Sequence, residues 1–118
     1  MAVFKRKLSG STDGKPILVV QTATAGTTIH TAVSGTTAGT FDEIWLWAFN
    51  SSASSVTLTV EFGGATAPDQ NIVVTLASKS GLQLITPGLI LQNGATVKAF
   101  AGTANVVTLN GFVNTMTD

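Results

Sequence analysis

Short runs of strand-forming residues, separated by loops rich in Gly, Ser and Thr, recur along the whole chain. Valine and threonine are abundant, as strands prefer, and no window shows a sustained apolar period of 3.6 residues. Within residues 56–62 (VTLTVEF) apolar and polar side chains alternate, which indicates a half-buried antiparallel strand. The segments that we predict as strands are residues 16–23, 27–33, 41–50, 56–62, 71–77, 82–92, 95–101 and 105–113.

These segments predict an all-β fold, and we expect an antiparallel two-sheet sandwich of about eight strands with a jelly-roll-like arrangement. An immunoglobulin-like sandwich is the alternative, although the cysteine pair of antibody domains is absent. Within residues 82–92, Pro87 and Gly88 favour a turn, so we expect this segment to form two short strands. We assign residues 1–15 to a basic N-terminal arm and residues 16–118 to a single sandwich domain.

The composition limits what the surface of this domain can be. Charged residues make up only 10% of the chain, hydrophobic residues make up 44%, and the formal net charge is zero. Because a typical protein carries ~25% charged residues, the surface must be covered by uncharged polar residues or be partly hidden against other subunits. This favours permanent assembly, and a small monomeric domain with a threonine-rich surface is the alternative.

Three features that the sequence lacks restrict where the chain can fold and which kinds of site it can form. The chain has no cysteine, which excludes disulfides and thiolate metal sites. The early apolar run ILVV is too short to span a membrane, so we expect no membrane partner. No apolar signal segment follows the basic residues near the N-terminus, so we expect the chain to fold in a cytoplasm.

Four of the six basic residues lie within the first fifteen positions, at Lys5, Arg6, Lys7 and Lys15. A basic arm ahead of a neutral body could grip an acidic surface, whereas a solvated, frayed terminus is the alternative. Three adjacent charges are few for nucleic-acid binding, which also requires basic residues interleaved with aromatic ones. Here the aromatic residues lie beside acids at positions 42 and 43, so no nucleic-acid partner is expected.

The residues needed for catalysis or for metal binding are largely missing. His30 is the only histidine, and its neighbours in sequence are threonines rather than acids. A nucleophilic triad needs a base with an acid to orient it, and one histidine with scattered carboxylates does not make a transition-metal site. Asp42 and Glu43 are adjacent, so in a strand they point to opposite faces. We therefore predict neither an enzyme nor a bound cofactor or metal.

The strand expected over residues 41–50 is apolar on both faces, because Ile44 and its alternate neighbours point one way while a row of aromatic residues points the other. The aromatic residues are Trp45, Trp47 and Phe49. We predict that they form a subunit interface, or that a loop or the N-terminal arm covers them. A platform for sugar rings is the third alternative, with Glu43 and Asn50 as the only polar groups close in sequence.

A resemblance supports association rather than catalysis. It rests on the order of five segments: TTIHTAV, DEIWLWAFN, VTLTVEFGG, SGLQLITPGLILQNGATVKAFA and ANVVTLNGFV. From about residue 27 to its end, the chain resembles small all-β structural proteins of tailed bacteriophages, most of all head decoration (cement) proteins.

The resemblance implies a virion protein on the capsid surface, assembled in the host cytoplasm. It implies a homotrimer that binds the major capsid protein and stabilises the assembled head. Residues of the basic arm are expected to contact the capsid, namely Phe4, Lys5, Arg6 and Lys7. The alternative is a carbohydrate- or receptor-binding module of a tail tip or fibre.

Overall fold

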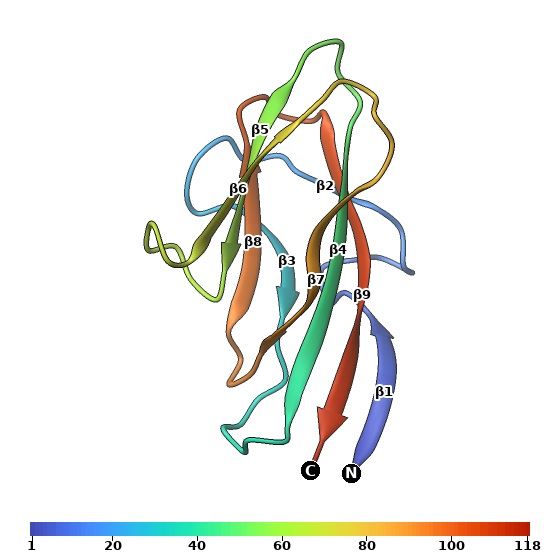
Figure 1. The fold of residues 1–118 in the computed structure, drawn as a ribbon, viewed down its shortest axis with the longest axis vertical. Coiled ribbons are helices and arrows are strands. Elements are labelled where there is room, and N and C mark those ends of the chain that lie inside the picture. The colour runs from blue at the N-terminus through green and yellow to red at the C-terminus, as the bar shows by residue number, and fades with distance from the viewer.

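The computed structural model describes residues 1–118 and contains nine β-strands. The strands are β1 (Ala2–Lys7), β2 (Ile17–Leu18), β3 (Thr27–Thr31), β4 (Phe41–Asn50), β5 (Val56–Phe62), β6 (Asn71–Leu76), β7 (Gln83–Leu91), β8 (Thr96–Ala101) and β9 (Val107–Thr117). They form two antiparallel sheets that pack against each other, which confirms the predicted all-β sandwich (Figure 1). No helix long and apolar enough to cross a membrane is present.

The order of strands in the two sheets is that of a jelly roll. Sheet A has the order β1–β9–β4–β7, with β2 also paired to β9, and sheet B has the order β3–β8–β5–β6. Apart from β1, the pairs nest within one another, because β2 pairs with β9, β3 with β8, β4 with β7, and β5 with β6. The chain is therefore one long hairpin rolled up so that successive pairs fall alternately in the two sheets, as a jelly roll requires.

The core lies between the sheets and follows the alternation of the sequence. In β4, Ile44, Leu46 and Ala48 are fully buried, while the residues between them point to the outer face. Seventeen buried apolar residues form one continuous cluster. Gly111 of β9 lies opposite Leu46 and allows the two central strands to approach closely, because a Cβ at this position would overlap the backbone oxygen of Trp45.

Part of the expected N-terminal arm is a strand of sheet A. β2 pairs with only the first half of the eleven-residue strand β9, which leaves the second half with a free edge. β1 occupies that edge and pairs with residues 112–117. Leu8, which follows β1, is only 1% exposed and fixes this segment to the core. The sequence does not indicate this strand, because three of its six residues are charged and it buries little apolar surface.

The segment around Pro87 is the single strand β7, so the prediction of two short strands is wrong. β7 is an edge strand bonded only to β4, and proline is tolerated there because its missing donor can face away from the neighbouring strand. Between Ile44 and Trp45 the register shifts by one residue at Gly88, whose φ of 77° fits a bulge. The strand therefore continues through the proline–glycine pair that the sequence marks as a turn.

Candidate interaction surface

Three aromatic rings stack on the outer face of sheet A. Trp45 and Trp47 come from β4, and Phe112 comes from β9, where it lies opposite Trp45. The ring centroids are 6.2 Å apart for the two tryptophans, 6.3 Å for Trp45 and Phe112, and 6.1 Å for Trp47 and Phe112. The ring planes differ by 28° at most, which is the offset stacking that aromatic pairs favour. We call these three residues the aromatic cluster.

Neighbouring strands cover the ring faces at both ends of the aromatic cluster. Gly88 of β7 packs against Trp45, since a Cβ at Gly88 would lie 3.0 Å from the Cζ2 atom of the indole. At the β1 side, the ammonium of Lys5 lies 4.4 Å from the ring centroid of Phe112, in a cation–π contact. Trp45 and Phe112 are therefore each partly covered by a neighbouring strand.

Glu43 holds the indole of Trp45 in place. Its Oε1 atom accepts hydrogen bonds from Trp45 Nε1 at 2.8 Å and from Asn114 Nδ2 at 3.0 Å. These bonds favour the ionised carboxylate, so Trp45 first and Asn114 second hold the pKa of Glu43 below its ordinary value, against a smaller upward effect of burial. One negative charge, that of Glu43, thus lies beside the aromatic cluster and is bonded to Trp45.

We expect the fluorescence of Trp45 to change as the pH falls through the lowered pKa of Glu43. Because this pKa is lower in the folded than in the unfolded chain, the carboxylate adds stability above its unfolded pKa, and that stability is lost as the pH falls through the folded value. Acid titration of tryptophan emission, with circular dichroism to exclude unfolding, measures the change. The Glu43→Gln variant should lack this transition, and an identical transition in the variant would contradict the assignment.

Exposed aliphatic side chains extend the aromatic cluster over the same face. Leu84 lies opposite Trp47, Ile90 lies opposite Glu43, and Val3 of β1 lies opposite a residue of β9 that shares this face. Their exposed fractions are 50%, 55% and 58%. We call the aromatic cluster together with these three residues the apolar face of sheet A.

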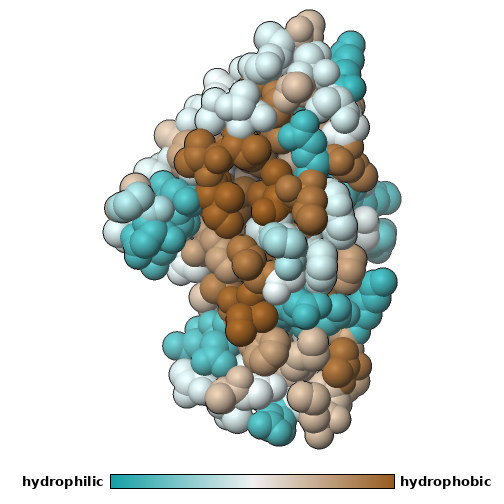
Figure 2. Space-filling model, in the orientation of Figure 1, coloured by the Kyte–Doolittle hydropathy of each residue, from teal (hydrophilic) through white to brown (hydrophobic).

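Apolar side chains also reach the surface at the edge of the sandwich. Figure 2 shows them gathered in a band over the region in which Figure 1 draws β6 and β7. On β6, Val73 is 62% exposed, and β7 contributes the exposed Leu89 and Ile90. Exposed apolar residues therefore also lie along the edge between β6 and β7, and of these only Ile90 belongs to the apolar face of sheet A.

Two of the three aromatic residues predicted to form an interface are brought together. Trp45 and Trp47 stack as neighbours, but their third partner is Phe112 rather than Phe49. Phe49 lies on the outer face of β4, half-buried and outside the stack. The alternation of residues 107–113 would place Phe112 on the outer face, but only the pairing of β4 with β9 brings it beside the tryptophans.

The four residues predicted to contact a capsid point to different parts of the molecule. Lys5 lies on the apolar face of sheet A, whereas Arg6 and Lys7 line a pocket between the sheets. Phe4 is 46% exposed, and its ring centroid lies 5.1 Å from the guanidinium carbon of Arg6. The residues of the basic segment therefore lie on two separate surfaces of the molecule.

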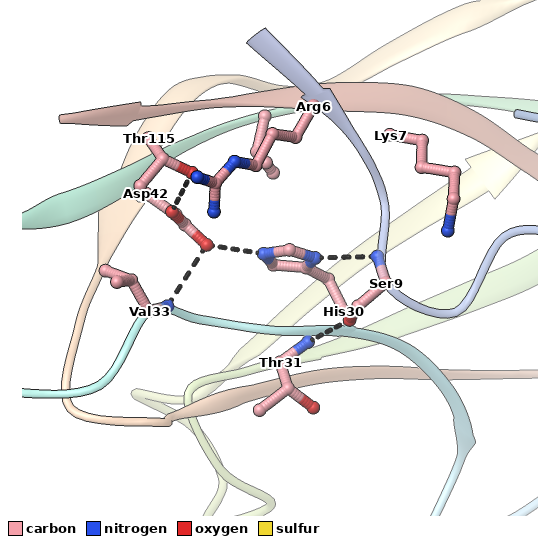
Figure 3. A pocket seen from close by; sticks show the side chains of 9 residues that line it. Arg6, Lys7, Ser9, His30, Thr31, Val33, Asp42 and Thr115 are labelled. Atoms are coloured by element: carbon pink, nitrogen blue, oxygen red, sulfur yellow. Dashed lines mark hydrogen bonds and ion pairs between the residues drawn. The ribbon is translucent and has the colours of Figure 1, made fainter. Parts of the chain in front are cut away.

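A buried polar cluster forms the floor of that pocket (Figure 3). His30 Nε2 lies 2.6 Å from Asp42 Oδ2. Thr115 donates its hydroxyl to Asp42 Oδ1 at 2.7 Å, and the backbone N–H of Val33 donates to Oδ2 at 3.2 Å. His30, Asp42 and Thr115 are 4%, 3% and 2% exposed, so this cluster is shielded from water.

The contacts of His30 determine which nitrogen carries the proton. The backbone N–H of Ser9 donates to His30 Nδ1 at 3.0 Å. Because Nδ1 accepts this bond, the hydrogen of the neutral ring lies on Nε2, which donates to the ionised Asp42. Both ring nitrogens are thus used within the chain, and the pair presents no free base to a substrate. Its role in this geometry is to join β3, β4 and the turn after β1.

No group of three or more His, Cys, Asp or Glu side chains is placed to hold a metal ion. Comparisons with protein-family models, curated proteins and solved structures find no match for this chain. Two features of the molecule are available for a function: the apolar face of sheet A and the pocket above the buried polar cluster.

Proposed function

We propose that this chain is a structural protein that acts by association, with the apolar face of sheet A as its contact surface. Within this class we propose a decoration protein of tailed-bacteriophage heads: a homotrimer that binds the major capsid protein on the virion surface and stabilises the assembled head. The observation that carries the proposal is the apolar face, where stacked aromatic rings and exposed aliphatic residues adjoin on one sheet.

The apolar face has the properties of a contact surface. Single exposed apolar residues are ordinary, but contiguous ones mark interaction sites. Tryptophan and phenylalanine are enriched in such sites because each buries a large area. Stacking, Gly88 and the hydrogen bond to Glu43 already order the rings, so binding would cost little further side-chain entropy.

Stabilisation of a shell requires binding and no chemistry. A protein that binds only the assembled shell stabilises it by mass action, and a trimer that bridges several capsid subunits gains avidity from modest individual contacts. The chain has a formal net charge of zero, so many copies can lie close together on one shell with little mutual repulsion.

One observation favours a second candidate, a carbohydrate- or receptor-binding module of a tail tip or fibre. Glu43 and Asn114 place polar groups beside partly buried tryptophans, as sugar recognition requires. Against it, Glu43 Oε1 already accepts two bonds, and neighbours cover the ring faces of Trp45 and Phe112. We therefore rank this candidate second.

The deciding experiment mixes the purified chain with empty shells assembled from the major capsid protein of the same genome, and sediments the shells. We expect saturable co-sedimentation and a higher temperature of shell disruption. A glycan array with the same protein tests the second candidate. Glycan binding without shell binding would replace the first proposal with the second, and failure of both would overturn both.

A further inference from the structure

A pocket of about 410 Å³ opens between the sheets, with residues of β1 and β3 in its lining (Figure 3). The buried His30–Asp42 pair forms its floor, and Arg6 points into it, whereas the side chain of Lys7 points away on the other side of β1. The proposed association through the outer face of sheet A makes no use of this pocket.

Arg6 reaches into the pocket without an acidic partner. On β1 it lies opposite the core residue Val113, so the strand directs its side chain toward the space between the sheets. Arg6 forms no salt bridge, and the only contact of a basic side chain with a carboxylate in the chain is the bond from the neutral ring of His30 to Asp42. Asp42 is the acid of the pocket lining, and it already accepts three hydrogen bonds. The guanidinium of Arg6 therefore has donors to offer to a group from outside.

The position of the guanidinium is partly preset. The ring of Phe4 lies 5.1 Å from its central carbon, in a cation–π contact that limits its movement. Lys7, the next residue of β1, points away from the pocket, and its ammonium is bonded to the backbone oxygen of Ser11 at 3.1 Å. The guanidinium of Arg6 is therefore the one cationic side chain directed into the pocket, beside the hydrogen-bonded carboxylate of Asp42.

A hydroxyl group supplies a further donor near Arg6. Ser9 Oγ accepts the backbone N–H of Thr31 at 2.7 Å, which leaves the hydroxyl hydrogen of Ser9 for a ligand. The pocket thus combines the planar fork of N–H donors of Arg6 with the hydroxyl of Ser9.

We propose that this pocket binds a carboxylate group, with Arg6 as its bidentate partner. A carboxylate matches the planar fork of a guanidinium with two parallel charge-assisted hydrogen bonds. The group could belong to a small dicarboxylic acid or to a glutamate or aspartate side chain of a bound protein, which share the same chemistry. Asp42 already accepts three hydrogen bonds, so the donors of Arg6 stay available to the entering group.

The test is an NMR titration of the ¹⁵N-labelled chain at constant ionic strength. One arm uses sodium glutarate, and the other uses a blocked, otherwise neutral peptide that contains one glutamate. We expect saturable shifts of the Thr31 and Val33 amides, and the arm with the tighter binding identifies the source of the carboxylate. Arg6→Gln should weaken binding by ~10-fold or more, and Arg6→Lys, which keeps the charge without the fork, should fall between.

Lys15→Gln is the matched control, because it removes one positive charge from an exposed residue outside the pocket lining. Its affinity for glutarate should equal that of the unchanged chain. The proposal is overturned if neither arm binds, if Lys15→Gln weakens binding as much as Arg6→Gln, or if inorganic phosphate binds more tightly than glutarate. Arg6 is exposed, so its variants should fold, and their amide spectra verify this.

Discussion

Replacement of Asp42 by alanine is expected to lower the free energy of unfolding by about 3–5 kcal/mol, because three buried donors lose their acceptor at about 1–3 kcal/mol each. The change leaves three buried donors without an acceptor: the Nε2–H of His30, the hydroxyl of Thr115 and the backbone N–H of Val33. Each unsatisfied group costs the free energy of its lost hydration. Urea unfolding followed by tryptophan fluorescence measures the loss.

Two control variants distinguish the loss of stability caused by disrupting this cluster from the small effect of a surface substitution. Thr115→Val removes one of the three bonds to Asp42 and should cost about 1 kcal/mol. Asp69→Ala removes an exposed carboxylate and should change stability by less than ~0.5 kcal/mol. If Asp42→Ala cost no more than Asp69→Ala, the buried polar cluster would have no structural role.

The cluster matters because of the segments that it joins. Asp42 lies on β4, in the centre of sheet A, whereas His30 lies on β3 of sheet B. Through Nδ1, His30 also holds the backbone of Ser9, just after β1. The cluster therefore closes the β1–β3 side of the sandwich, where the sheets are joined by polar contacts, while the opposite side exposes apolar residues of β6 and β7.

The strands that form the core could be predicted because their signal is local. Successive side chains of a strand point to opposite faces of the sheet. The buried faces of residues 56–62 and 41–50 can therefore be predicted without knowing which strands pair with them. The same rule predicted that Asp42 and Glu43 point to opposite faces, and the structure confirms this. Many short strands in one small domain predicted a two-sheet sandwich, and the observed pairing shows that its strand order is the expected one of a jelly roll.

Features that depend on pairing between distant segments could not be predicted in this way. Phe112 joins the two tryptophans only through the register of β4 with β9. Pro87 and Gly88 read locally as a turn, but an edge strand with a bulge accommodates them. β1 carries little apolar surface, and it forms because β9 has a free edge.

One signal in the sequence did point to the buried polar cluster. Asp42 lies in phase with Ile44 and Leu46, on the side of β4 that enters the core. A carboxylate in that position requires donors, and His30 is the only histidine of the chain. The proximity of the two side chains nevertheless depends on how sheet B packs on sheet A, which no local pattern records.

Lysine at both Leu84 and Ile90 is expected to abolish self-association. We expect the unchanged chain to have, at micromolar concentration, a mass three times its 12.1 kDa in light scattering after size exclusion. In the Leu84→Lys/Ile90→Lys variant, assembly would bury two ammonium groups against an apolar surface, at a cost of several kcal/mol each. Both residues are at least half exposed, so the fold itself should be little changed and the variant should run as a monomer.

Val73→Lys is the matched control for this variant, because Val73 is 62% exposed but lies on β6 of sheet B. It introduces the same charge at a similar exposure on the other sheet, and it should leave the mass and the shell binding unchanged. If the Leu84→Lys/Ile90→Lys variant stayed a trimer and the Val73→Lys variant ran as a monomer, the subunit interface would lie at the edge of sheet B and not on sheet A. If the chain without substitutions ran as a monomer but still bound shells, the apolar face would contact only the capsid. Shell binding would then be the only association that buries Trp45, Trp47 and Phe112.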